Sequence, residues 1–171
     1  MLAFQLIFFV LLVVSDSPEG SSSFCDGPIS ICGKKLTTSI AKVDKSDTSL
    51  KCWKCQADGA ATLRFGDIAA SADGMTVSQL DGNRFSFMLV GNSVLRIRGL
   101  SATATKISWA MDDRPMMLEG DARITVVIDG KPSTFAADTI TFDAINNTLK
   151  LSDGTTQSLP SSRTNALVVP R

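Results

Sequence analysis

A diverged repeat in the C-terminal two-thirds constrains the fold of this chain more than any other feature. The segment at 104–110, Ala-Thr-Lys-Ile-Ser-Trp-Ala, returns at 137–143 as Ala-Asp-Thr-Ile-Thr-Phe-Asp, an offset of 33 residues. A looser copy begins at Ala72, 32 residues before Ala104. Periods of this size are typical of supersecondary units that bury a core only by stacking on their neighbours. The repeat therefore predicts an elongated architecture, and disfavours an enzyme with one central pocket.

Apolar and polar residues alternate within the repeats. Ile107 and Trp109 alternate with Ser108, and Ile124 alternates with polar neighbours in the same way. This period of two indicates half-buried strands. Turn-favouring pairs separate these segments, namely Asp81-Gly82, Asp129-Gly130, Asn146-Asn147 and Asp153-Gly154. The pattern predicts an all-β fold of repeated antiparallel strands.

Composition excludes several classes of function. The 171 residues carry 17 basic and 17 acidic side chains, and no basic stretch of the kind that marks a nucleic-acid binder stands out. The chain contains no histidine, which is the commonest general base and metal ligand. We therefore expect a protein that is not an enzyme, with no catalytic residues, no cofactor, no metal and no nucleic-acid partner.

The N-terminus has the pattern of an export signal. Residues 2–14 form an apolar run interrupted only by Gln5, too short to span a bilayer but suited to the apolar region of a signal peptide. No Lys or Arg follows Met1, so a short membrane anchor and a buried N-terminal strand are the alternatives. We predict a signal peptide or anchor over 1–15, a linker over 16–24, and an exported protein of the periplasm or outer envelope.

Four cysteines lie in a short segment at 25–60, ahead of the repeat domain at 61–154 and a tail at 155–171. They are Cys25, Cys32, Cys52 and Cys55. In an exported chain such a group favours two structural disulfides, with three possible pairings. A zinc site and a redox pair are the alternatives, because Cys52 and Cys55 have the spacing of a zinc knuckle and of thiol–disulfide oxidoreductases.

The repeat resembles the OstA-like lipopolysaccharide-transport family. The resemblance runs through Leu-Glu-Gly-Asp-Ala-Arg-Ile-Thr at 118–125, Phe-Ala-Ala-Asp-Thr-Ile-Thr-Phe-Asp at 135–143 and Asn-Asn-Thr-Leu-Lys-Leu at 146–151, and it covers roughly 66–154. It implies a folded-over antiparallel sheet, a β-jellyroll or β-taco, with an apolar interior for acyl chains. It also implies end strands that pair with related β-jellyroll proteins or with other copies of the chain. The cysteine segment lies outside this pattern.

The alternating faces supply candidates for a groove that binds lipopolysaccharide or another amphiphile. They are Phe87, Leu89, Ile107, Trp109, Leu118, Ile124, Ile140, Phe142, Leu149 and Leu151. Large, adaptable apolar side chains suit irregular apolar ligands, and they equally fill an ordinary core. The leading hypothesis is a binding or scaffold protein, and the alternative is a thiol or zinc-binding module on a β platform. We also expect the strand at 148–151 to be the end strand available for pairing.

Overall fold

The structure is a computed structural model that describes residues 11–16, 22–26, 29–42, 51–81, 84–97, 99–110, 114–128 and 130–159. This part of the chain is all-β, as predicted, and contains no helix, so it offers none that could cross a membrane. The strands are β1 (Leu11–Asp16), β2 (Ser22–Asp26), β3 (Ile29–Gly33), β4 (Lys35–Lys42), β5 (Lys51–Phe65), β6 (Ile68–Asp81), β7 (Arg84–Ile97), β8 (Leu100–Ala110), β9 (Met116–Ile128), β10 (Lys131–Asp143), β11 (Thr148–Leu151) and β12 (Thr156–Ser158).

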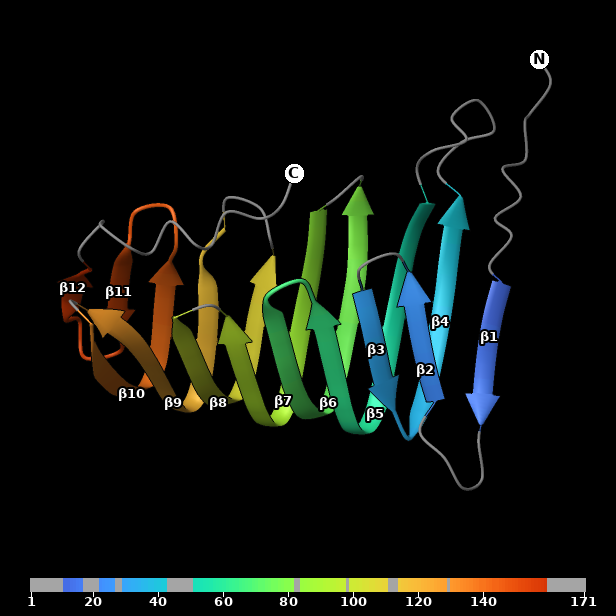
Figure 1. Cartoon of the computed structure of the whole chain (residues 1–171), viewed down its shortest axis with the longest axis horizontal. Coiled ribbons are helices and arrows are strands. Elements are labelled where there is room, and N and C mark those ends of the chain that lie inside the picture. Colours follow the sequence, from blue (N-terminus) through green and yellow to red (C-terminus); the bar gives the residue numbers. More distant parts are fainter. Residues whose placement is uncertain are drawn as a thin grey trace, which may run out of the picture.

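All twelve strands belong to one antiparallel sheet. Its order is β1-β4-β5-β6-β7-β8-β9-β10-β11-β12, and the β2–β3 hairpin joins it where β3 pairs with β5. From β4 onward each strand therefore pairs with the next strand in the chain. Figure 1 shows these strands stacked side by side along the long axis of the molecule.

The long strands β5 to β10 each bend sharply at one place, which we call the corner. The register shifts there in every pairing, for example between Asp58 and Ala61 on β5. On three strands the bend contains two consecutive residues with positive φ, and these pairs are Gly59-Ala60, Gly91-Asn92 and Gly120-Asp121. Such bulges kink a strand and increase its twist, so a stack of them folds the whole sheet over.

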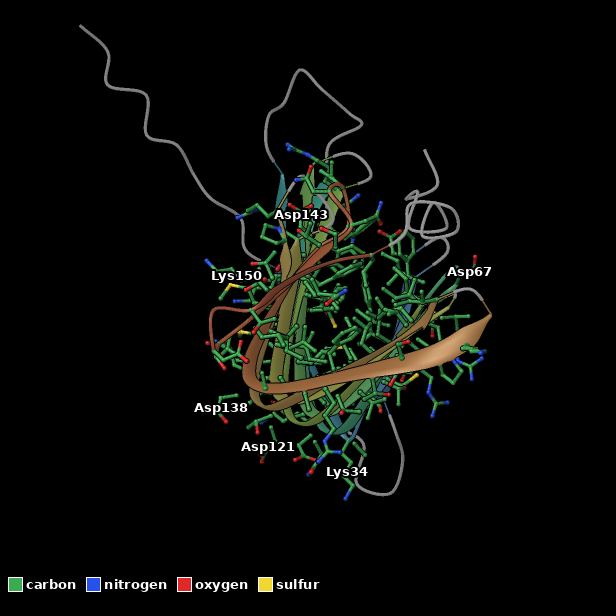
Figure 2. All side chains as sticks on the ribbon, turned by 90° about the vertical axis from the view of Figure 1, so that its left-hand side faces the viewer. Lys34, Asp67, Asp121, Asp138, Asp143 and Lys150 are labelled. Atoms are coloured by element: carbon green, nitrogen blue, oxygen red, sulfur yellow. The ribbon has the colours of Figure 1, made fainter. Side chains whose placement is uncertain are left out.

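The corner divides the sheet into two arms. Arm A comprises β1, β4, β11, β12 and segments 51–58, 74–81, 84–90, 106–110, 116–119 and 139–143; arm B comprises β2, β3 and segments 61–65, 68–72, 93–97, 100–104, 122–128 and 131–137. Figure 2 looks along the stack and shows Lys34, Asp121 and Asp138 on the outside of the corner. Asp143 and Asp67 lie at the far ends of arms A and B, away from the corner, and we call this side of the molecule the mouth.

A row of small side chains lines the inside of the corner. It runs across the strands through Ala61, Ala72, Ser93, Ala104, Ala122 and Ala137. Five of these residues are buried, and Ala137, on β10, is half-buried. The two arms converge at this row, so there is no room for larger side chains. The Ala that begins each copy of the sequence repeat is therefore a corner residue, on β6, β8 and β10 in turn.

The cysteine segment is continuous with the repeat domain in this structure. β5 runs through the expected boundary at residue 60, and its buried residues Trp53 and Ala57 face the same interior as Leu63. β12 lies in the expected tail. The predicted export signal falls largely outside the described residues, which begin with β1, and it stays a prediction.

Candidate functional site

The interior between the arms is the candidate site. Nine of the ten groove candidates are buried there, none of them more than 7% exposed, while Leu151 is half-buried. Five of the ten form one cross-strand row of arm A, through Leu89, Ile107, Leu118, Ile140 and Leu151. The alternation of the sequence thus placed them on the correct face, and their side chains pack against one another as a core.

Only Ile124 among these candidates belongs to arm B. The opposite wall also includes Ile31, Leu63, Leu95 and Leu100, all buried. The candidates predicted from the sequence come mostly from one wall because neighbouring strands repeat the same pattern, and sequence alone does not say which segments face each other. Apolar residues at every second position, Ile29 and Ile31 on one strand and Trp53 and Cys55 on another, were a signal that the interior extends into the cysteine segment.

Aromatic side chains connect the arms at the N-terminal end of the mouth. Trp53 on arm A lies 4.9 Å, ring centroid to ring centroid, from Phe24 on arm B, and 6.1 Å from Phe85. Phe85 in turn lies 5.1 Å from Phe65 of arm B. The indole Nε1 of Trp53 donates a 2.7 Å hydrogen bond to Asp26 on β2. This end of the interior is therefore closed by contacts between the two arms.

The C-terminal end is built differently, because arm A is longer there. β11 and β12 extend arm A, whereas segment 131–137 of β10 pairs with β9 and has no second neighbour among the described strands. Half-buried apolar side chains gather at this end, namely Ile128, Phe135, Ala137, Ala144 and Leu151. This arrangement corrects the expectation for 148–151: β12 pairs with β11 and is the end strand of arm A, while segment 131–137 of β10 is the open edge of arm B.

The predicted disulfides are wrong for the described cysteines. Cys25, Cys32 and Cys55 are free thiols. The β2–β3 register sets Cys25 opposite Ser30 and Cys32 opposite Ser23, while Cys55 lies on the inner face of arm A opposite Thr38. The side chain of Cys52 lies outside the described residues.

The surroundings of Cys55 do not suit a reactive thiol. The Thr38 hydroxyl donates a 3.7 Å hydrogen bond to its Sγ atom. Burial nevertheless raises the pKa of the Cys55 thiol above its ordinary value, against the smaller lowering effect of this bond. A nucleophilic cysteine needs the opposite shift. The described residues also contain no group of three or more potential metal ligands.

A shallow polar depression lies at the C-terminal end of the corner. It is lined by Asp121, Ala122, Arg123, Ala136, Ala137, Asp138, Ser152 and Asp153. The carboxylate of Asp153 accepts a hydrogen bond from the backbone N–H of Thr155 at 2.8 Å. This bond is the main reason why the pKa of Asp153 lies below its usual value. That carboxylate stabilises the turn between β11 and β12, so its geometry has a structural explanation.

No protein-family model matches the chain, and none of the curated proteins matches it. The fold and site of the described residues define the class as a folded-over antiparallel β-sheet with an apolar interior.

Proposed function

We propose that the chain is a non-enzymatic binding and scaffold protein that holds the acyl part of an amphiphile between its two arms. One observation carries the proposal: two apolar inner faces pack against each other, and continuous strands join their arms only along the corner. The arms converge on small side chains at the corner and carry large ones beyond it, such as Leu89 and Ile124. Movement of the arms about the corner would admit a chain-like apolar ligand without breaking strand pairing.

The chemistry of the interior favours an acyl ligand over a polar one. Ser22 and Ser93 are the buried polar residues of the described part, and Ser93 Oγ donates to the backbone carbonyl of Thr105 at 3.4 Å. Met75 and Met116 add flexible, polarisable surface that adapts to an irregular ligand. The repeat's resemblance to OstA-like proteins supports lipopolysaccharide as the first amphiphile to test, and the apolar run at 2–14 supports export as the location.

Site-specific photocrosslinking tests this function. A photoreactive phenylalanine analogue is placed at Phe142 or Trp109, and in matched controls at Thr141 or Ser108, which are adjacent on the same strands but face outward. Labelled lipopolysaccharide should crosslink from the two inner positions. Equal labelling from inner and outer positions, or none from the inner ones in a folded protein, would contradict the proposal.

The open edge of β10 supports a second element of the proposal, docking of another β-strand. An edge with unpaired backbone groups is a template for strand addition. We propose that a related β-sheet protein or a second copy pairs with segment 131–137 and covers the half-buried side chains of Phe135 and Leu151. Head-to-tail pairing of this kind does not have to close, so it would give open assemblies.

A further inference from the structure

The outer faces of the two arms differ in charge. Arm A carries cations beside carboxylates: Lys106 forms a 2.6 Å ion pair with Glu119, and Lys35 is directly opposite Asp58. On arm B, the described side chains that point outward include three arginines and no carboxylate. We call this the arginine face, defined by Arg64, Arg96 and Arg123.

The register places these arginines on the same outer face of arm B. Arg64 and Arg96 share a cross-strand row, with Ala69 of β6 between them. Two strand spacings separate them, roughly 10 Å. Arg123 lies in the next row, opposite Thr103 on β8. All three side chains are exposed.

The residues between the arginines are mostly small hydroxyl side chains. Thr62 and Thr103 lie in the row of Arg123, while Ser101, Thr125 and Thr134 continue the row of Arg64 and Arg96. Hydroxyls and guanidinium groups both donate hydrogen bonds to phosphate oxygens, and the fork of arginine matches phosphate in a bidentate manner. The nearest described carboxylate along the chain from Arg64 is Asp67, at the tip of the arm (Figure 2).

We propose that the arginine face docks on an anionic lipid surface. A six-stranded face with dispersed cations suits a layer of phosphate headgroups, and the exposed Val127 adds an apolar contact at the headgroup level. The acidic side chains of the corner, Asp73, Asp121 and Asp138, lie along its border and orient the molecule with the corner away from the anionic plane. Docking of this face is independent of any ligand between the arms.

Vesicle co-sedimentation of the full chain tests the docking. The probes are vesicles of phosphatidylcholine alone and of phosphatidylcholine mixed with phosphatidylglycerol. The variant Arg64→Gln/Arg96→Gln/Arg123→Gln should lose about a hundredfold in affinity for the anionic vesicles, since each arginine near such a surface contributes about a factor of five. The matched control, Lys54→Gln/Lys106→Gln/Lys150→Gln, removes the same charge from arm A and should change affinity little.

The possible outcomes separate cleanly. Binding that requires phosphatidylglycerol, weakens with added salt and depends on arm B alone supports docking. Equal losses in both triple variants, or unchanged binding in the arginine variant, would overturn it, as would tighter binding of the same face to a DNA duplex. If the triple variant does not fold, Arg96→Gln alone should still reduce affinity about fivefold. Loss of lipopolysaccharide crosslinking at Phe142 with vesicle binding intact would instead refute only the interior ligand.

Discussion

Trp53 and Asp26 lie on opposite arms of the folded sheet, and a 2.7 Å hydrogen bond from the indole Nε1 to the carboxylate joins them. Trp53 is only 4% exposed, whereas Asp26 is exposed. A bond to a charged acceptor is stronger than one between neutral groups. The contact therefore links β5 to the β2 hairpin across the mouth and closes one end of the interior.

Trp53→Phe should destabilise the protein by about 1–2 kcal/mol, because it removes the hydrogen bond and part of the ring packing. The free energy of unfolding in urea measures the loss. A double-mutant cycle with Asp26→Ala isolates the bond itself. If the loss of stability in the double variant equalled the sum of the losses in the two single variants, the two residues would not interact.

The corner requires glycine at position 91, where φ is +73°. An added Cβ would lie 2.9 Å from the Cβ of Asp73 and 3.0 Å from its Cγ, and the Asp73 carboxylate accepts a 2.9 Å hydrogen bond from the side-chain amide of Asn92. Gly91→Ala should cost about 2–4 kcal/mol, the sum of a left-handed backbone and a steric clash.

Gly99→Ala is the matched control for that substitution. Gly99 has nearly the same φ of +75°, but nothing lies within 4 Å of an added Cβ. Its cost should therefore be the backbone term alone, about 1–2 kcal/mol. Equal urea midpoints for the two variants would show that the approach of Asp73 to Gly91 does not matter.

The turn between β10 and β11 should make stability depend on pH. The backbone N–H of Asn146, its side-chain amide and the N–H of Ile145 all donate to Asp143, and they hold the pKa of that carboxyl below its ordinary value of 3.8. Because the folded-state pKa is the lower one, this stabilisation is present above pH 3.8 and is lost as the pH falls through the folded pKa. The variant Asp143→Asn should be less stable than wild type at neutral pH, and the difference in free energy of unfolding should shrink over that acidic range. Urea titrations at several pH values measure it, and a difference that does not change with pH would contradict the assignment.

Thiol labelling should distinguish the described cysteines by burial. Exposed Cys25 should react readily with a maleimide in the native state, whereas Cys55, fully buried and with a raised pKa, should react only on unfolding. Mass spectrometry of protein alkylated in denaturant without reductant should find Cys25, Cys32 and Cys55 all modified. If any of these cysteines were alkylated only after a reductant is added, the disulfide interpretation would be restored.

Thr134→Pro should weaken any self-association through β10. Pro132, two residues away, pairs with Val127, and proline fits a strand only where no ladder donor is required. Position 134 therefore directs its N–H to the open edge as well, and proline there removes a donor for an incoming strand. Sedimentation over a wide concentration range should show association in wild type that decreases in the variant. Lys150→Pro should have less effect on association, since β11 is already paired by β12.

Local pattern was enough to predict much of this fold. The alternation around Ile107 and Trp109 predicted both the strands and their buried face, because side chains alternate across every strand regardless of what covers them. The repeat beginning at Ala72, Ala104 and Ala137 predicted an elongated stack of similar units. The reason these alanines recur became visible only in three dimensions, where they line the inside of the corner.

The sequence by itself thus determined an all-β, repeating chain and which side chains point inward. Tertiary structure alone decided which segments face each other, because pairing across a fold depends on register and bending, which no local pattern records. It placed Cys55 inside and Cys25 outside, which leaves their thiols apart. It also covered β11 with the three residues of β12, and it left an open edge on arm B at segment 131–137 of β10.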